Sequence, residues 1–299
     1  MTDARTSPGW KTRQVVLSSR PLSWINTAFP FAAAYVVTTG HVDAPLVTGT
    51  LFFLVPYNLL MYGINDVFDY ESDLRNPRKG GAEGALLDPG LHRTVMLAGI
   101  LSAAPLLVAM LVFAGTEHPW SWFILALSLF AVVAYSVPGL RFKERPVLDS
   151  VTSSTHFVSP AVYGLAVAGA VVSPALLALL AAFFLWGMAS HAFGAVQDVA
   201  PDREAGIASI ATAFGSARTV RLAITGWALA GLLMLATEWP GPLAALLALP
   251  YIAAAWPYRS IPDDRAQAAN AGWKRFLLRF LTGFFVTMLL IAWVAIRDS

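Results

Sequence analysis

Long apolar segments recur along the whole chain, and they constrain its fold more than any other feature. A transmembrane helix needs about 20 mostly apolar residues. Nine stretches meet this requirement: 22–40, 44–64, 94–115, 119–137, 151–170, 174–196, 218–237, 241–258 and 277–296. Only 13% of the residues are charged, whereas about a quarter are charged in a soluble domain. We therefore predict an all-α membrane protein whose nine transmembrane helices form one domain over 22–299, preceded by a basic leader at 1–21.

The basic residues are sorted between the two ends of these predicted spans. Of the 20 Lys and Arg residues, 19 lie in the leader, in the connections after the second, fourth, sixth and eighth spans, or in the adjoining helix turns. Only Arg297 falls on the opposite side. Because basic loops remain in the cytoplasm, we predict a multi-pass protein of the plasma membrane with a cytoplasmic N-terminus and an outer C-terminus. We expect lipid contacts and no nucleic-acid partner.

Acidic residues gather in two of the connections on the predicted cytoplasmic side. The first cluster, which we call the first Asp motif, comprises Asn65, Asp66, Asp69 and Asp73. If the second span continues as a helix, its three carboxylates fall on one face. Like charges about 6 Å apart repel by roughly 3 kcal/mol at an effective dielectric near 20. A row of carboxylates on one helical face therefore needs a cation to neutralise it.

Hard oxygen ligands with no His or Cys beside them are typical of magnesium sites. The first Asp motif therefore predicts a Mg²⁺ site with Asn65 among its ligands. A solvated acidic helix end is the alternative reading of this segment. The chain has no cysteine, which excludes disulfides, thiolate metal sites and cysteine nucleophiles.

The second Asp motif runs from Asp198 to Gly206 and places Asp198 and Asp202 four residues apart. This spacing puts both carboxylates on one helical face. Alone it is a weak signal, but it lies on the same predicted side as the first motif. Two facing acidic ridges predict two magnesium ions with a diphosphate held between them, and catalytic roles for Asp66, Asp69, Asp198 and Asp202.

Cationic groups near the two motifs would compensate the charge of a departing diphosphate. The candidates are Arg75, Arg78, Lys79, Lys143 and Arg203, and among them we predict a catalytic role for Lys143. Each of them also satisfies the charge rule for cytoplasmic loops, so any one of them could serve orientation alone.

Three polar residues within the predicted spans are weaker candidates. Asn58 lies seven residues before Asn65, which favours a second contact to the diphosphate. His156 and His191 lie inside spans, where ionisable groups are functional candidates, although a hydrogen-bonded buried histidine is the simpler reading of both.

The motif Asn65-Asp66-x-x-Asp69-x-x-x-Asp73, together with Asp198-x-x-x-Asp202, resembles the two metal motifs of the UbiA superfamily of intramembrane prenyltransferases. The element that begins at Tyr135 and reaches Lys143 is similar to a third feature of that family. The resemblance implies nine helices around a central cavity, Mg²⁺, an isoprenyl diphosphate donor, and Tyr135 and Lys143 near the diphosphate.

A narrower resemblance links the chain to the lycopene elongase branch of the superfamily. It rests on three segments, 56–66, 76–85 and 197–212. It implies magnesium-dependent transfer of five-carbon units from dimethylallyl diphosphate to the ends of lycopene, with or without hydration, and carotenoid cyclases as partners. The alternatives are a prenyltransferase that acts on an aromatic, quinone or lipid-headgroup acceptor and, more distantly, an ion-coupled transporter.

Overall fold

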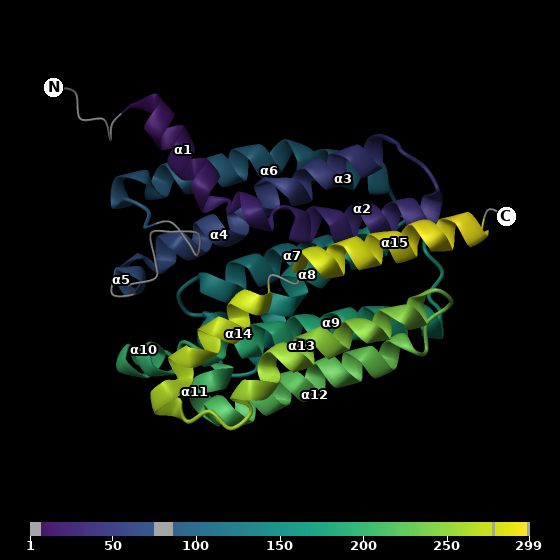
Figure 1. Cartoon of the computed structure of the whole chain (residues 1–299). Coiled ribbons are helices and arrows are strands. Elements are labelled where there is room, and N and C mark those ends of the chain that lie inside the picture. Colours follow the sequence, from purple (N-terminus) through teal and green to yellow (C-terminus); the bar gives the residue numbers. More distant parts are fainter. Residues whose placement is uncertain (1–6, 75–85, 277–278, 298–299) are drawn as a thin grey trace. The chain divides into compact units, whose positions relative to one another are not determined.

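The computed structural model describes the backbone of residues 7–74, 86–276 and 279–297, and it leaves the side chains of residues 72, 73, 279 and 280 undescribed. Within these residues every regular element is a helix (Figure 1). The main helices are α1 (Pro8–Ser18), α2 (Ile25–Thr39), α3 (Ala44–Leu54), α4 (Pro56–Phe68), α6 (His92–Ala114), α7 (Pro119–Ser136), α8 (Leu148–Val167), α9 (Pro174–Val196), α12 (Ser216–Met234), α13 (Ala248–Ala255) and α15 (Arg279–Arg297). The short helices near the connections are α5 (Tyr70–Asp73), α10 (Val199–Glu204), α11 (Ile210–Phe214) and α14 (Asn270–Arg275).

Each of the nine stretches predicted from the sequence contains a helix, and the prediction of an all-α chain is confirmed. Among the described residues, five helical segments are long and apolar enough to cross a membrane: Ala44–Phe68, Pro89–Ala114, Pro119–Ser136, Pro174–Val196 and Gly241–Tyr258. The count of nine spans, the orientation of the termini and the single domain over 22–299 remain predictions.

Two predicted stretches are interrupted at prolines. Proline lacks the N–H that a helix interior needs but is tolerated in the first turn. Pro56 accordingly ends α3 at Leu54 and begins α4. The stretch 241–258 divides into a 3₁₀ helix at Gly241–Leu247, α13, and a second 3₁₀ turn at Trp256–Tyr258.

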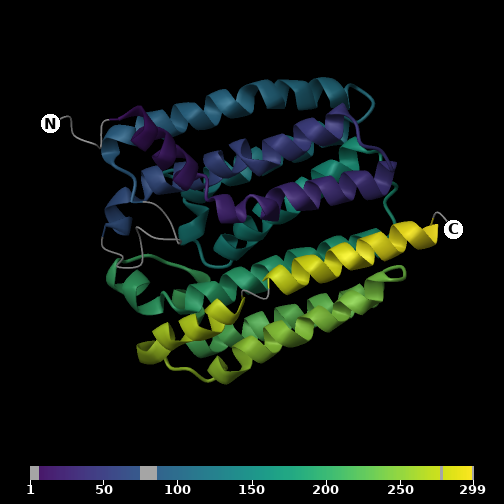
Figure 2. The ribbon, with the colours of Figure 1, turned by 45° about the horizontal axis from the view of Figure 1, so that its top comes forward.

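The chain forms two compact units, and the first comprises residues 1–141 and 159–170. In it α2, α3 and α6 run alongside one another (Figures 1 and 2). Their interior is an aromatic cluster of Phe31, Phe52, Phe53, Tyr57 and Tyr163.

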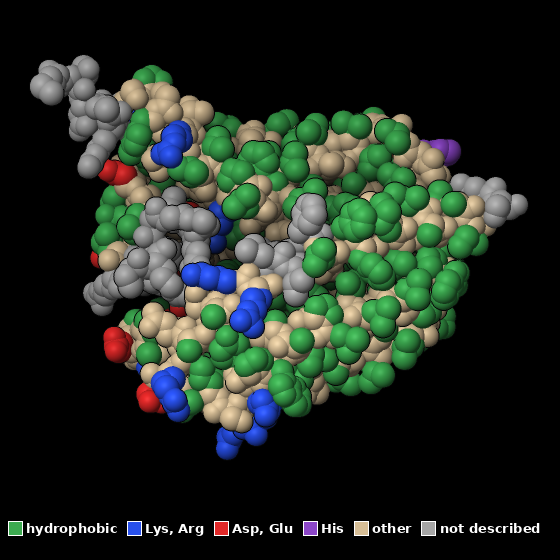
Figure 3. Space-filling view, in the orientation of Figure 1, with side chains coloured by type: hydrophobic (Ala, Val, Ile, Leu, Met, Phe, Trp, Pro, Cys, Tyr) green, Lys and Arg blue, Asp and Glu red, His purple; other side chains and the backbone are tan. Residues whose placement is uncertain are grey.

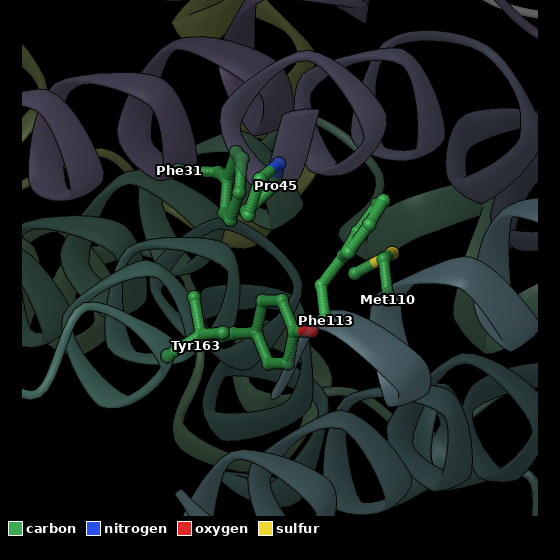
Figure 4. Close-up of a pocket in the computed structure, with 6 residues that line it drawn as sticks. Phe31, Pro45, Met110, Phe113 and Tyr163 are labelled. Atoms are coloured by element: carbon green, nitrogen blue, oxygen red, sulfur yellow. The ribbon is translucent and has the colours of Figure 1, made fainter. Parts of the chain in front are cut away.

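A close contact between helices and a narrow pocket lie beside this cluster. At Gly164 of α8 a Cβ atom would lie 2.8 Å from the carbonyl oxygen of Phe31, so glycine is what lets α8 approach α2 so closely. The apolar pocket is lined by Phe31, Tyr163 and the side chains of Pro45, Met110, Phe113 and Val167 (Figure 4).

The second unit comprises residues 142–158 and 171–299. Here α9 packs along α12, and α13 lies against α12 (Figure 1). Trp227 and Tyr251 stack with their ring centroids 5.6 Å apart, and the ring of Phe276 lies 5.2 Å from that of Tyr251. These three buried rings form the centre of the core of this unit.

The outer face of the second unit is apolar along its helices. Hydrophobic side chains cover α12, α13 and α15, whereas Lys and Arg side chains gather around α11 and α14 (Figure 3). Leu229, Leu232, Leu246 and Leu249 are between 46% and 61% exposed. Contiguous exposed apolar surface of this kind marks contact with an apolar environment, which agrees with the span prediction.

Candidate active site

The first Asp motif lies where α4 ends, in the first unit. Asp66 is in the last turn of α4, and Asp69 is its C-terminal cap, with its N–H donating to the carbonyl of Asn65 at 2.9 Å. The chain resumes helix at Tyr70, as α5. The expectation that the helix continues through the motif is therefore confirmed, apart from the cap at Asp69. Both Asp66 and Asp69 are buried, at 1% and 7% exposed.

Asp66 pairs with Arg20, which the sequence had indicated only as a basic residue of the leader. The guanidinium Nη2 of Arg20 lies 3.0 Å from Asp66 Oδ1. The same guanidinium lies 4.3 Å from the ring centroid of Tyr62, a cation–π contact. Arg20 has φ 50°, in the left-handed region that L-residues seldom occupy, and it precedes Pro21, which disfavours a right-handed helical conformation there.

Asp69 and Asn65 also have partners from the first unit. Arg141 Nη2 lies 3.6 Å from Asp69 Oδ1. The hydroxyl of Ser136, at the end of α7, donates to Asn65 Oδ1 at 3.0 Å. The half-buried Tyr135 is the residue before Ser136, so the tyrosine element that resembles the family feature lies directly beside a contact to the first Asp motif.

Asn58 lies in the interior of the first unit, fully buried. Its Nδ2 donates to Thr27 Oγ1 at 2.7 Å and to the carbonyls of Phe53 and Leu54 at 2.9 and 3.1 Å. Carbonyls in the last turn of a helix lack intrahelical partners. Asn58 therefore satisfies the end of α3 at the proline break, and its predicted contact to a diphosphate remains a prediction.

The second Asp motif connects α9 to α10 in the second unit. Asp198 is the cap before α10, and the N–H of Asp202 donates to the carbonyl of Asp198 at 2.9 Å. This helical turn places the two half-buried carboxylates on one face, as their spacing predicts. Asn270 Nδ2 donates to Gln197 Oε1, and Gln197 Nε2 to the carbonyl of Gly194 at 3.0 Å.

Arg203, inside the second motif, pairs with a carboxylate that the sequence analysis did not select. Its Nη1 lies 2.7 Å from Asp263 Oδ2, and its Nη2 donates to the carbonyl of Thr212 at 3.2 Å. The N–H of Ser216 donates to the other oxygen of Asp263 at 2.7 Å. Asp263 and Thr212 thus hold the Arg203 guanidinium in place, and a contact between Arg203 and a diphosphate would use its remaining N–H donors.

The remaining predicted residues fall into three groups. Lys143 lies in a single 3₁₀ turn at Phe142–Glu144 and is half-buried. His191 is half-buried and hydrogen-bonded between its Nδ1 and Ser150 Oγ at 3.0 Å, which agrees with the simpler reading of a hydrogen-bonded histidine. The cations Arg75, Arg78 and Lys79 and the side chain of Asp73 lie outside the described residues.

In the part of the chain that the structure describes, no three His, Asp or Glu side chains gather as a metal-binding group. The donors available in each motif are nevertheless of one chemical kind. Asp66 with Asp69 and Asp198 with Asp202 offer carboxylate oxygens, which are the ligands magnesium prefers. The residues present therefore fit a magnesium ion.

The described residues form only helices, several of them long and apolar enough to cross a membrane, with a carboxylate motif at a helix end, which is the arrangement expected of an intramembrane prenyltransferase. The sequence profile of the UbiA prenyltransferase family matches residues 27–282, and the chain belongs to this family. It is a prenyltransferase, and the transporter alternative is set aside.

Several curated proteins are similar in sequence over most of the chain. The lycopene elongase/hydratase of Corynebacterium glutamicum is 49% identical over 283 residues, which cover 94% of this chain and 98% of that protein. The C(50) beta-cyclic carotenoids biosynthesis protein LbtBC of Dietzia sp. is 53% identical over 276 residues, which cover 92% of this chain. The aligned part is only 63% of the length of that Dietzia protein. The lycopene elongase/hydratase of Haloferax volcanii is 37% identical over 253 residues, 82% of this chain and 80% of that protein.

Solved structures share the fold at low sequence identity. A UbiA homolog from Archaeoglobus fulgidus bound to DMAPP and Mg²⁺ has a TM-score of 0.63 at 19% identity and covers 91% of this chain and 98% of its own. Digeranylgeranylglyceryl phosphate synthase has a TM-score of 0.64 at 15% identity, covering 95% and 98%. These two similarities show that this chain has the same helical fold as the two solved proteins.

Proposed function

We propose that this chain transfers five-carbon prenyl groups from dimethylallyl diphosphate to the ends of lycopene, with magnesium as its cofactor, in the synthesis of fifty-carbon carotenoids. The observation that carries the proposal is the 49% identity to a lycopene elongase/hydratase along nearly the whole of both chains. The Archaeoglobus fulgidus homolog, bound to DMAPP and Mg²⁺, supports the donor and the metal.

The proposed metal ligands are the two Asp motifs: Asn65, Asp66, Asp69, Asp73, Asp198 and Asp202. Bound magnesium would neutralise the charge of the diphosphate leaving group. Around it, Lys143, Tyr135 and the cations Arg75, Arg78 and Lys79 would donate to the diphosphate, and Asn58 and Arg203 are further candidates. Donors placed where charge develops lower the barrier most.

The reaction breaks the bond between the allylic carbon and the diphosphate oxygen. The terminal alkene of lycopene supplies the electron pair for the new carbon–carbon bond, and the diphosphate leaves with the electrons of the broken bond. The resulting tertiary cation loses a proton, or it takes up water and then loses a proton. An apolar interior excludes water from the allylic centre until bond formation.

The proposed setting follows from the charge distribution. With 19 of 20 basic residues on one predicted side, the site would open to the cytoplasmic face of the plasma membrane. Carotenoid cyclases that act on the fifty-carbon product are the proposed partners, and the lipid bilayer would deliver the hydrophobic acceptor.

The test uses membranes containing the full chain, supplied with dimethylallyl diphosphate, Mg²⁺ and lycopene. We expect forty-five- and fifty-carbon products by mass spectrometry, and none when EDTA replaces Mg²⁺. A prenyltransferase that acts on an aromatic, quinone or lipid-headgroup acceptor would give no product from lycopene. No product from lycopene, together with turnover of a hydroxybenzoate or naphthoate with a long prenyl donor, would refute the carotenoid acceptor.

A further inference from the structure

A carboxylate outside both Asp motifs is completely buried in the second unit. Asp149 lies in the first turn of α8 and is 0% exposed. Its Oδ1 accepts the N–H of Ser150 at 2.7 Å, and its Oδ2 accepts the N–H of Ile210, 61 residues away, at 2.7 Å. A buried carboxylate is costly unless strong hydrogen bonds stabilise it, and these two short bonds are of the charge-assisted kind.

The bond to Ile210 holds the helix that follows the second Asp motif. Ile210 is the first residue of α11, and the first N–H groups of a helix have no partner within it. Ser209 and Thr212 form a capping box that satisfies two other donors at this end. Asp149 supplies the acceptor for Ile210 from a different helix, so it ties α11 to α8.

Further hydrogen bonds connect α11 to the motif itself. Arg203, the neighbour of Asp202, donates from Nη2 to the carbonyl of Thr212 in α11 at 3.2 Å. The N–H of Ile207 donates to the carbonyl of Asp202 at 2.8 Å. Between them Gly206 turns the chain with φ 70°. The segment from Asp202 to α11 is thus a closed turn, and Asp149 is the group that anchors its far end.

We propose that Asp149 is a positioning residue, which sets the affinity of the second Asp motif for magnesium by fixing α11 and the turn that joins it to Asp202. Magnesium tolerates little departure from octahedral geometry. Groups that orient metal ligands without touching the metal typically change metal affinity about 10–100-fold when they are removed. This role rests on the proposed function only in requiring that the second motif binds magnesium.

The test compares Asp149→Asn with a matched control in the same helix. Asparagine keeps the shape but can accept only one of the two N–H groups. The control is Ser154→Ala, because Ser154 is equally buried in α8 and donates to the carbonyl of Phe184 at 2.7 Å, away from the motif. The first readout is the Mg²⁺ concentration that gives half of the thermal stabilisation by dimethylallyl diphosphate in detergent, which needs no acceptor.

We expect Asp149→Asn to raise this Mg²⁺ concentration about 10-fold while the rate of product formation at saturating Mg²⁺ stays within a few-fold of the wild type. Ser154→Ala should leave the half-saturating Mg²⁺ concentration unchanged. Equal behaviour of the two variants, or a fall in rate that saturating Mg²⁺ does not restore, would overturn the assignment. Because the stabilisation is measured without lycopene, failure of the lycopene reaction alone would count against the proposed function and not against this role.

A second variant removes the same hydrogen bond from its other end. Ile210→Pro deletes the donor at a position where proline is well tolerated. The preceding Ser209 already has an extended backbone, φ −145° and ψ 169°, as proline requires of its neighbour. Ile210→Pro should raise the half-saturating Mg²⁺ concentration as Asp149→Asn does. If both variants fail to fold, Asp149 acts in folding and the positioning role is wrong.

Discussion

Arg20 and Asp66 form an ion pair at 3.0 Å although 46 residues separate them in the chain. The Asp66 side chain is 0% exposed and that of Arg20 is 20% exposed. Pairing with Arg20 therefore offsets the free-energy cost of burying the Asp66 carboxylate away from water. The pair links the segment before α2 to the end of α4, where the first Asp motif begins. The cation at this position neutralises a carboxylate that we propose as a magnesium ligand.

Replacing Arg20 with Gln should lower the stability of the protein more without magnesium than with it. Removing one partner of a buried pair costs about 3 kcal/mol, and a bound Mg²⁺ would replace part of the lost charge. The measurement is the melting temperature in detergent with EDTA and with Mg²⁺. Arg13→Gln, on the exposed side of α1, is the control and should change neither value. The same loss in both conditions would show that Asp66 does not bind the metal.

Replacing Asp66 or Asp198 with Asn should reduce magnesium-dependent diphosphate release by about 100-fold or more, because a group that stabilises developing charge is lost. Release of diphosphate from dimethylallyl diphosphate is measured in membranes at saturating Mg²⁺. The control is Glu71→Gln, an exposed carboxylate in α5 outside the proposed ligand set. Undiminished release by either aspartate variant would remove that residue from the metal site.

Asp263 should stabilise the turn of the second Asp motif only while it is ionised. The N–H of Ser216, first, and then the Arg203 guanidinium hold the pKa of Asp263 below its usual range. The stabilisation is therefore complete above the ordinary aspartate pKa of about 4, and it is lost as pH falls through the lowered folded value. We expect Asp263→Asn to melt earlier than the wild type at pH 7, with the difference shrinking below about pH 4. Asp264→Asn, at the exposed neighbouring position, should match the wild type throughout, and a pH-independent difference for Asp263→Asn would contradict the prediction.

Replacing Asn58 with Ala should cost about 2 kcal/mol of stability, because it removes the side-chain donor of the Leu54 carbonyl and leaves Thr27 as the remaining donor to the buried Phe53 carbonyl. Chemical or thermal unfolding in detergent measures the loss. Thr12→Ala, in the exposed helix α1, is the control. An unchanged stability would contradict the role seen in the structure, and a raised KM for dimethylallyl diphosphate would support the predicted diphosphate contact as well.

Much of the fold and part of the site could be predicted because they depend on residues close together in the chain. Apolar length predicted the helices, and the spacing of Asp66 and Asp69 or of Asp198 and Asp202 predicted shared helical faces. The family predicted from these motifs is confirmed by the match over residues 27–282. The break at Pro56 was missed, because prolines occur within membrane helices and the apolar stretch continues through it.

The partners of the motifs could not be predicted in the same way. Arg20 was read as one more cation of the leader, and Asp149 and Asp263 carried no pattern that set them apart. Their contacts join positions 46, 61 and 60 residues apart. The choice among many Arg and Asp side chains at such separations depends on how the helices pack, which local spacing does not encode.

The sequence by itself predicted that this protein is helical and apolar and that it belongs to the prenyltransferase family, both of which are confirmed, and it nominated the carboxylates that we propose as metal ligands. Helix periodicity and the cost of placing charge in an apolar surrounding are local, so the chain reports them directly. Only the tertiary structure decided that Arg20 neutralises Asp66, that Arg203 pairs with Asp263, and that the buried Asp149 anchors the helix after the second motif. Those contacts exist because packing brings distant segments within hydrogen-bond distance, and for the buried carboxylates of Asp66 and Asp149 burial makes an unpaired charge costly.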